Sequence, residues 1–251
     1  TFSIIYNDEQ LRDFSFEIDS ILKSFDAELS LYVDSSDISK FNNGNAHFYL
    51  SNKSNYIKNC FQKSKEVYSL TNGAFNPAIF PLVNYWGFYD NSKKNDSIKQ
   101  TVIDSLLNII SFNDSSFCLV NDTVSKEDEV FQIAPFFYKM NPKSKLDFNA
   151  IAQGFSVDVI AEFLVEMGLN NYMVEIGGEV RVSGFNPDGD LWKIGVDQPI
   201  ENSSPGENDF EFIVSLNNVS LATSGNYRKF YEKNGIKYSH TINPSNGYPV
   251  D

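Results

Sequence analysis

The sequence predicts an α+β fold, and two observations lead to this prediction. Three stretches repeat apolar residues every three or four positions, which is the periodicity of an amphipathic helix. Alternating and β-branched runs, which are typical of strands, cluster in the C-terminal half. Helices and strands therefore do not follow one another in an even βαβ alternation, and the pattern favours a mixed architecture.

The three helices are expected at Glu9–Leu29, at about Asn55–Leu70 and at Gly154–Met167. In the first of them, the apolar residues from Leu11 onward recur at steps of three and four, as one buried helix face requires. The second is followed by "TNG" and the third by Gly168, and glycine commonly ends a helix at this position.

Five runs are expected to be strands: "NYMVEI", "EVRVSG", "WKIGV", "FEFIVSL" and "SLATSG". Two polar stretches, Asp90–Asp104 and "DQPIENSSPGENDFE", are rich in Asn, Ser, Asp and Pro and are expected to be surface loops. The chain shows no internal repeat and no clear linker. We therefore expect a single domain over residues 1–251.

Composition excludes some classes of partner. The 33 acidic and 20 basic residues give a formal charge of −13, which repels phosphate backbones and argues against nucleic acid binding. An anionic small ligand would need helix N-termini, backbone N–H groups, an arginine or a metal ion. No apolar run approaches the roughly 20 residues that a membrane span needs.

Two further features concern the thiols and the N-terminus. Cys60 and Cys118 lie far apart in apolar surroundings, which predicts two buried free thiols rather than a disulfide or a metal site. The sequence begins "TFSIIYND", without an initiator Met or a signal segment. We therefore expect a trimmed N-terminus, with any export signal outside this sequence.

A glycine pair separates two of the expected strands in "YMVEIGGEVRVSG". Gly177 and Gly178 fit either a tight hairpin turn, which is the commoner case, or a close approach of the backbone to a ligand. Glu175 and Glu179 flank the pair. The residues themselves leave both interpretations open.

The stretch "TNGAFNPAIFPLVNYWGFYD" crowds Gly, Pro and aromatic residues into a segment that neither period explains. It is either a structural loop held by prolines or a site for a flat heteroaromatic ring, which small and aromatic residues suit. In "LDFNAIAQGFSVD", Asp147 ends an apolar run just before a helix. Its carboxylate either caps that helix or binds a hydroxyl or ring nitrogen of a ligand.

Two stretches near the C-terminus contain polar residues that suit chemistry. "LATSGNYRKFY" offers Thr223, Ser224 and Gly225 with Arg228, a short pattern that can cradle a phosphate. "KYSHTINPSNGYP" contains His240, one of only two histidines. With an ordinary pKa of about 6.5, its imidazole can act as a general base for a hydroxyl, although a structural role is equally open.

Taken together and in this order, the stretches "SLYVDSSDISKFN", "GAFNPAIFPLVNYWGF", "LDFNAIAQGFSVD", "VEIGGEVRVSG" and "ATSGNYRKFYEKNGIKYSHTINPSNGYP" resemble the ApbE family, the FAD:protein FMN transferases. The resemblance covers essentially the whole chain. It implies a fold related to the T-fold, with mixed helices and antiparallel strands around one flavin site. It also implies an exported lipoprotein that is anchored at the membrane and faces the periplasm or the cell exterior.

The family resemblance implies a magnesium-dependent reaction in which FMN passes from FAD to a Thr or Ser hydroxyl of an acceptor protein, with release of AMP. Two alternatives stay open, namely a FAD pyrophosphatase that gives FMN and AMP, and a FAD-binding protein without turnover. The expected ligands are FAD and Mg2+. The expected partner is a protein with a Thr/Ser flavinylation motif, and membrane contact is expected only through a lipid anchor outside this sequence.

Carried over residue by residue, the resemblance makes His240 the base for the acceptor hydroxyl and places the Ala150 carbonyl on magnesium. The residues expected to bind FAD are Tyr32, Ala74, Phe75, Asn76, Asp147, Gln153, Glu175, Gly177, Gly178, Ser224 and Ile242.

Four positions differ from the residues that are usual in the family. Asn76 and Asn243 stand where Asp is common, Gln153 where Lys or Glu is common, and Asn246 where Thr is common. These changes remove charge but keep hydrogen-bonding capacity. The sequence also ends at Asp251, before a segment whose Asp and Thr side chains complete the magnesium site in the family, so we expect weak magnesium binding by this sequence.

Overall fold

The computed structural model describes residues 2–44, 46–50, 55–89, 98–120, 123–126, 129–132, 136–198, 200, 210–225, 230–233 and 235–250, and the structural statements below concern these residues. The chain divides into two compact units, each described by itself. Unit 1 comprises residues 1–22 and 151–239, and unit 2 comprises residues 23–150 and 240–251. The expectation of a single domain stays a prediction.

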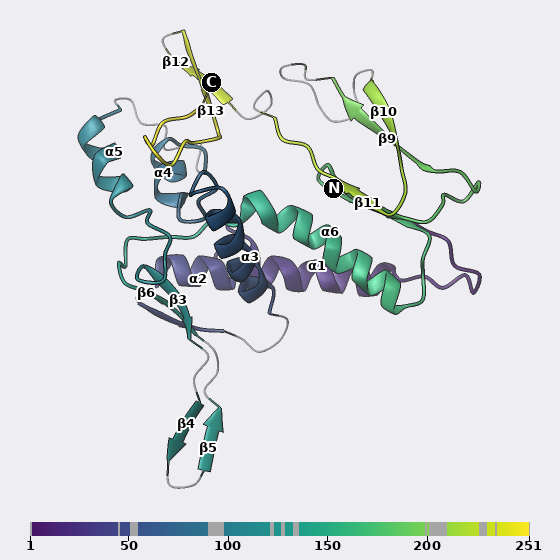
Figure 1. The fold of residues 1–251 in the computed structure, drawn as a ribbon, viewed down its shortest axis with the longest axis horizontal. Coiled ribbons are helices and arrows are strands. Elements are labelled where there is room, and N and C mark those ends of the chain that lie inside the picture. The colour runs from purple at the N-terminus through teal and green to yellow at the C-terminus, as the bar shows by residue number, and fades with distance from the viewer. Residues whose placement is uncertain are drawn as a thin grey trace. The chain divides into compact units, whose positions relative to one another are not determined.

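Unit 1 is built on an antiparallel four-stranded sheet with the order β1-β7-β8-β11 (Figure 1). Its strands are β1 (Phe2–Tyr6), β7 (Tyr172–Ile176), β8 (Glu179–Ser183) and β11 (Val219–Leu221). Two separate antiparallel pairs belong to the same unit, β9 (Trp192–Asp197) with β10 (Phe210–Leu216) and β12 (Phe230–Lys233) with β13 (Ile236–Ser239).

The β7–β8 hairpin confirms the turn interpretation of the glycine pair. Ile176 pairs with Glu179, so Gly177 and Gly178 form a two-residue turn. Their φ angles are 60° and 103°. A two-residue turn with positive φ at both positions matches the twist of the flanking strands, and glycine adopts such angles without steric cost.

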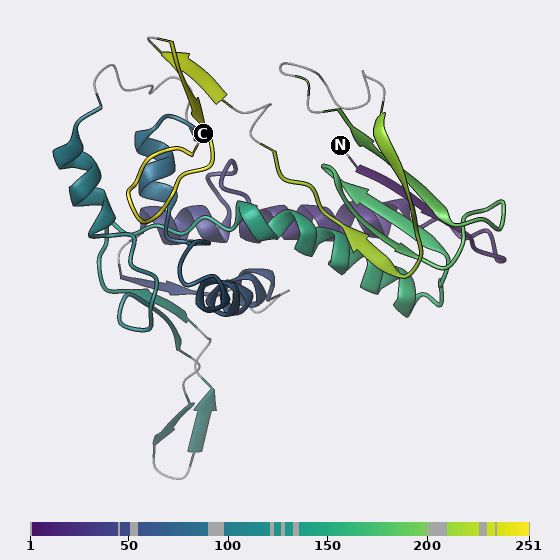
Figure 2. The same ribbon diagram turned by 45° about the horizontal axis from the view of Figure 1, so that its top comes forward.

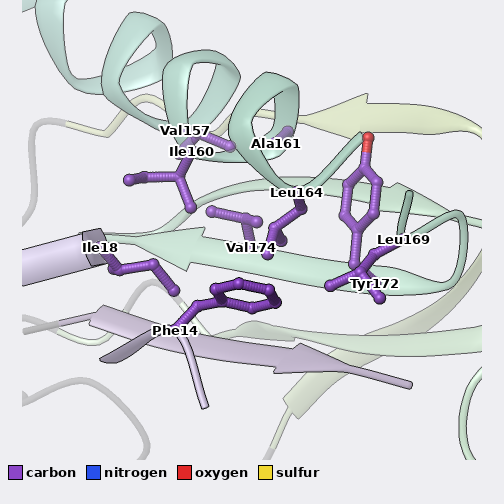
Figure 3. Close-up of a cluster of buried hydrophobic side chains, with 9 residues drawn as sticks. All are labelled: Phe14, Ile18, Val157, Ile160, Ala161, Leu164, Leu169, Tyr172 and Val174. Atoms are coloured by element: carbon purple, nitrogen blue, oxygen red, sulfur yellow. The ribbon is translucent and has the colours of Figure 1, made fainter. Parts of the chain in front are cut away.

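The core of unit 1 lies between this sheet and α6 (Asn149–Glu166), which runs along one face of the sheet (Figure 2). On α6, residues three and four positions apart share the buried face. Burying one large aliphatic side chain contributes about 1.5–3 kcal/mol, so the cluster is a principal source of stability for unit 1. Figure 3 shows its nine residues: Phe14, Ile18, Val157, Ile160, Ala161, Leu164, Leu169, Tyr172 and Val174.

Unit 2 combines four whole helices and the C-terminal part of α1 (Ser15–Leu29) with short strands among its described residues. The helices are α2 (Asp37–Asn43), α3 (Tyr56–Leu70), α4 (Phe80–Tyr85) and α5 (Gln100–Leu107). The strands β2 (His47–Tyr49), β6 (Phe136–Lys139) and β3 (Phe117–Val120) form an antiparallel sheet in the order β2-β6-β3, and β4 (Thr123–Lys126) pairs with β5 (Glu129–Gln132).

Aromatic rings dominate the core of unit 2. The Phe61 ring contacts the rings of Phe112 and Phe137, with centroids 5.5 and 4.8 Å apart. The Phe41 ring contacts those of Phe117 and Phe137 at 6.3 and 5.8 Å. Phe41, Phe61, Phe117 and Phe137 come from α2, α3, β3 and β6, and Phe112 lies in the segment before β3, so ring packing joins the helices to the sheet.

The three predicted helices are confirmed, with shifted starts. α3 agrees closely with the prediction. The first helix, α1 (Ser15–Leu29), begins later than Glu9, because Leu11 has a left-handed φ of 55° that no helix accommodates. α6 begins five residues before Gly154, at Asn149.

The predicted strands are present, although "SLATSG" contributes only to the short β11. Sequence periodicity did not reveal the other strands or α2, because elements this short show too few repeats of a period. The loop prediction for Asp90–Asp104 is wrong at its end, where α5 begins at Gln100, and 90–97 lie outside the described residues. Most of "DQPIENSSPGENDFE" also lies outside them. The segment without periodicity contains the short helix α4.

Both cysteines are free, as predicted, although only Cys60 is buried and Cys118 is half-buried. Burial and the nearby Glu28 charge raise the pKa of Cys60 to about 12. In the part of the chain that the structure describes, no helix has the length and apolarity that crossing a bilayer requires.

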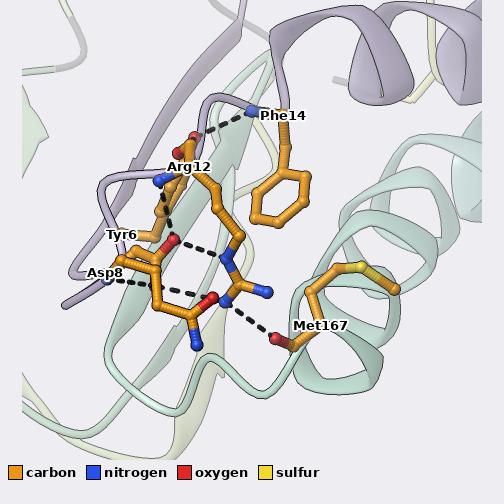
Figure 4. A network of polar contacts seen from close by, with 6 residues as sticks. Tyr6, Asp8, Arg12, Phe14 and Met167 are labelled. Atoms are coloured by element: carbon orange, nitrogen blue, oxygen red, sulfur yellow. Dashed lines mark hydrogen bonds and ion pairs between the residues drawn. The ribbon is translucent and has the colours of Figure 1, made fainter.

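A polar network ties the start of α1 to the end of α6 (Figure 4). Arg12 Nε and Nη2 donate to the two carboxylate oxygens of Asp8 at 2.8 and 3.1 Å, and Nη2 also donates to Met167 O at 3.1 Å. Tyr6 OH donates to Arg12 O at 3.2 Å and accepts from Phe14 N at 3.1 Å. The hydrogen bonds from Arg12 lower the pKa of Asp8 to about 2.

Replacing Asp8 with Asn should lower the free energy of unfolding near neutral pH, because the Arg12 pair loses its charge. The pKa of Asp8 is 3.8 in the unfolded chain and about 2 in the fold. The stability that ionised Asp8 contributes is therefore fully present above pH 3.8 and is lost as the pH falls through about 2. Denaturant unfolding of wild type and Asp8→Asn should show that their difference in the free energy of unfolding shrinks as the pH falls from 3.8 to about 2. Asp188→Asn, at an exposed aspartate of the same unit, is the control, and a difference independent of pH would contradict the prediction.

Candidate functional site

The residues predicted to form the site fall in both units. Hydrogen bonds and ring contacts within each unit show which of them lie together. Unit 2 holds Tyr32, Ala74, Phe75, Asn76, Asp147, Ala150, His240 and Ile242. Unit 1 holds Gln153, Glu175, Gly177, Gly178 and Ser224.

The loop between α3 and α4, called the α3–α4 loop below, is braced by Asn76. Asn76 Oδ1 accepts from Ala78 N at 2.9 Å, and Nδ2 donates to Ile110 O at 2.9 Å. Both polar atoms of this amide therefore have protein partners. Ala74 is exposed and Phe75 is half-buried on the same loop, so these two residues present apolar surface next to a fixed backbone.

Asp147 is tied to the α3–α4 loop. Its main-chain N donates to Pro77 O at 2.7 Å. Its Oδ1 accepts from Asn149 N at 2.8 Å, which forms an Asx turn directly before α6 and pairs the first N–H of the helix, one residue short of the N-cap position that one interpretation of the sequence predicted. Capping does not exclude ligand binding, because a carboxylate has about four acceptor positions on two oxygens.

Tyr32 lies near Asp147. Partial burial and the Asp147 charge raise the pKa of Tyr32, and Tyr89 adds to the effect. The Tyr32 and Tyr89 rings stack with centroids 5.8 Å apart and 21° between their planes. Because Tyr32 is still 68% exposed, aromatic surface is available to a ligand close to a carboxylate.

The C-terminal segment 240–250 forms a closed loop that begins at the half-buried His240, directly after β13. Asn243 N donates to Tyr248 O, and Gly247 N donates to Asn243 O, both at 2.8 Å. Trp86 Nε1 donates to Gly247 O at 2.7 Å. These bonds fix the main chain that follows His240.

Ile242 and Asn243 shape the same loop. Ile242 is buried and forms a β-bridge with Pro249. Asn243 Oδ1 accepts from Ser245 N and Ser245 Oγ at 2.9 and 2.8 Å. Asn and Asp serve such turns equally well, since only an acceptor oxygen is needed.

In unit 1, Gln153 on α6 reaches the β7–β8 turn. Its Nε2 donates to Gly177 O at 2.6 Å and to the Glu179 carboxylate. Glu175 Oε1 accepts from Gly178 N at 2.7 Å. Burial raises the pKa of Glu179, while the hydrogen bond from Gln153 opposes the rise. The structure thus brings these predicted residues together around one turn, and their contact with a ligand stays a prediction.

The remaining predicted residues make fewer described contacts. Thr223, Ser224 and Gly225 follow β11 and are exposed, and Arg228 lies outside the described residues. The other histidine, His47, is on β2 with its ring 4.9 Å from that of Tyr138.

Magnesium has one predicted ligand, the Ala150 carbonyl. Among the described residues, no group of three or more His, Cys, Asp or Glu side chains is placed to hold a metal ion. Mg2+ requires about six oxygen ligands in octahedral geometry. Mg2+ also takes carbonyl, water and substrate phosphate oxygens as ligands, so magnesium binding and the role of the Ala150 carbonyl stay predictions.

Sequence reasoning missed two buried polar residues near Asp147. Asn42 is 3% exposed and Lys139 is fully buried. A usable signal existed only for Lys139, which follows the buried Phe137 by two positions on a strand and so lies on the same face. Asn42 is followed by Asn43 at the end of a short helix, and an asparagine there gives no sign of burial in the sequence.

The chain belongs to the ApbE family, whose model matches residues 1–251. It is 32% identical over 235 residues to the FAD:protein FMN transferase of Haemophilus influenzae, a match that covers 93% of this chain and 64% of that protein. It is 30% identical over 237 residues to the protein of the same name from Vibrio cholerae, covering 94% of this chain and 64% of that one.

Solved structures agree with this assignment and confirm the predicted fold class. The structure matches the flavin transferase ApbE from Vibrio cholerae with a TM-score of 0.75 and 29% identity, over 100% of this chain and 74% of that chain. It matches the flavinyl transferase ApbE of Pseudomonas stutzeri, apo form, with a TM-score of 0.78 and 26% identity, over 100% and 72%.

The two asparagines that stand where the family commonly has Asp should respond differently to that substitution. Asn76→Asp loses the donor to Ile110 O and places a charge against a carbonyl, so it should lower the free energy of unfolding by about 1–3 kcal/mol. Asn243→Asp keeps both hydrogen bonds that Oδ1 accepts from Ser245, so it should change the free energy of unfolding by less than about 0.5 kcal/mol. Denaturant unfolding of both variants measures the difference, and equal effects would show that the Asn76 donor is unimportant.

Proposed function

We propose that this protein transfers FMN from FAD to a Thr or Ser hydroxyl of an acceptor protein. The observation that supports the proposal is family membership over the whole sequence, with relatives that bear the name of this activity. The chain spans 64% of the length of each of these two relatives, so the activity is proposed for the protein that contains it.

The reaction is a substitution at phosphorus. The acceptor oxygen attacks the phosphorus on the riboflavin side of the FAD pyrophosphate, and a new phosphoester bond forms. The bond from that phosphorus to the bridging oxygen breaks, and this oxygen leaves as part of AMP. The hydroxyl proton passes to a base, for which we propose His240.

Unit 2 supplies a physical basis for flavin nucleotide binding. Tyr32 provides exposed aromatic surface beside the Asp147 carboxylate, and Ala74 and Phe75 lie on a loop that is hydrogen-bonded to the Asp147 main chain. A flat heteroaromatic ring can stack on the aromatic surface while a carboxylate accepts from its N–H group.

Purified protein incubated with FAD and Mg2+, with and without an acceptor that carries a Thr/Ser flavinylation motif, tests the proposal. Covalent flavin fluorescence on the acceptor should appear together with an equal amount of AMP. Release of FMN and AMP at the same rate without acceptor would identify a FAD pyrophosphatase instead. Tight FAD binding without AMP release would identify a binding protein, and a parallel incubation with EDTA tests the proposed need for magnesium.

We further propose that the protein acts outside the cytoplasmic membrane as a lipid-anchored protein, as the family resemblance implies. Fractionation of cells that express the full gene, followed by detection in the membrane and soluble fractions, tests this location. Recovery in the cytoplasm would contradict it.

His240→Ala should slow FMN transfer by about 10² to 10⁴, the usual effect of losing a general base, and leave FAD affinity nearly unchanged. Single-turnover transfer at saturating FAD measures the chemical step, and calorimetry measures affinity. His47→Ala, at the only other histidine, is the matched control and should change neither. A loss of FAD affinity and thermal stability together would assign His240 a structural role, and unchanged transfer would remove it from the mechanism.

A further inference from the structure

Asp147 is carried by a main-chain segment that is buried on either side of it. Leu146 and Phe148 are each 1% exposed, whereas Asp147 is half-buried. The three residues belong to no helix or strand. Because buried N–H and C=O groups must be paired, this segment needs hydrogen-bond partners that regular secondary structure does not supply.

Asn42 supplies two of these partners. Its Nδ2 donates to Leu146 O at 2.8 Å, and its Oδ1 accepts from Leu146 N at 2.7 Å. The Asn42 amide thus pairs with both main-chain groups of Leu146, as a residue on a neighbouring β-strand would. The next main-chain N–H, that of Asp147, donates to Pro77 O, so the segment is held by two different parts of unit 2.

Lys139 donates hydrogen bonds to the last turn of α2, which carries Asn42. Its Nζ donates to Phe41 O at 2.9 Å and to Asn42 O at 3.1 Å. These carbonyls are at the C-terminal end of α2, where the intrahelical pattern leaves acceptors free and a positive charge is favourable. The ammonium also lies 5.1 Å from the centroid of the Phe41 ring.

The buried lysine is difficult to explain by stability alone. Burial, with repulsion from Lys145, lowers the pKa of Lys139 to about 8. The partners described for its ammonium are neutral carbonyls and a ring, and a buried charge costs free energy that an apolar side chain of similar size does not. The ammonium group, unlike an apolar side chain, donates hydrogen bonds that hold the C-terminal end of α2 in place.

We propose that Asn42 is a positioning residue for the Asp147 carboxylate, and that Lys139 holds Asn42 in place. The consequence for FAD rests on the proposed function, whereas the placement of the carboxylate does not. The two can be separated because Tyr32 reports the position of Asp147 without any ligand.

The first measurement is therefore the Tyr32 titration, followed by NMR of protein labelled with ¹³C-tyrosine and assigned with Tyr32→Phe. Asp147→Asn should lower the pKa of Tyr32, since the Asp147 charge raises it in the wild type. Asn42→Leu should also lower the pKa of Tyr32. In protein that already carries Asp147→Asn, it should cause no further change in this pKa. An additive effect, or no effect of Asn42→Leu on Tyr32, would overturn the proposal.

The second measurement is FAD affinity. Asn42→Leu should weaken FAD binding about tenfold, and by much less when Asp147→Asn is already present. Ser144→Ala is the matched control, because the buried Ser144 lies two residues before Leu146 and its Oγ donates a hydrogen bond to Ile109 O. It should lower stability without changing the Tyr32 titration.

Lys139→Met keeps the test decisive if Asn42→Leu does not fold. This variant leaves the Phe41 and Asn42 carbonyls without their donor, so it should lower the melting temperature and also lower the pKa of Tyr32 in the same direction as Asn42→Leu. An unchanged Tyr32 titration in Lys139→Met would overturn the role of Lys139. If the wild type does not bind FAD while both variants shift Tyr32, the positioning of Asp147 stands and the proposed function fails.

Discussion

The hydrogen bonds of a buried segment without secondary structure are the constraint on which the candidate site in unit 2 depends. The main chain of residues 146–148 passes between buried side chains and pairs with Asn42 on one side and Pro77 on the other. Since an unpaired buried amide costs about 1–3 kcal/mol, these partners cannot be lost without displacing the segment. The position of the Asp147 carboxylate follows from how its backbone is paired.

The same device recurs around the other predicted ligand residues. The Asn76 amide fixes the α3–α4 loop, the Asn243 amide shapes the C-terminal loop, and Gln153 reaches the β7–β8 turn. In each case a side-chain amide pairs with main-chain atoms outside regular helices and strands. Binding residues on loops need such support, because the loop itself has no periodic hydrogen-bond pattern to hold it in one conformation.

This arrangement changes the meaning of the differences from the usual family residues. By sequence, Asn76 and Asn243 both stand where Asp is common in the family and are equivalent losses of charge. In the structure, Asn76 uses both a donor and an acceptor, whereas the turn at Asn243 uses only an acceptor. The Asn76 amide N–H group therefore has an acceptor at Ile110 O that an Asp could not use. At position 243, by contrast, an Asp could form the same turn as Asn.

The sequence by itself determined the α+β class and the three long helices, because periodicity reports burial locally. The order of five motifs indicated the family, whereas the glycine pair was left open between a hairpin turn and a ligand contact. The sequence also marked Asp147 and the residues of the β7–β8 turn as candidates. Only the tertiary structure decided what holds them. Asn42 meets Leu146 across 104 residues and Lys139 meets Phe41 across 98. No local pattern encodes such pairs, because a polar side chain looks the same in sequence whether it faces water or a distant buried backbone.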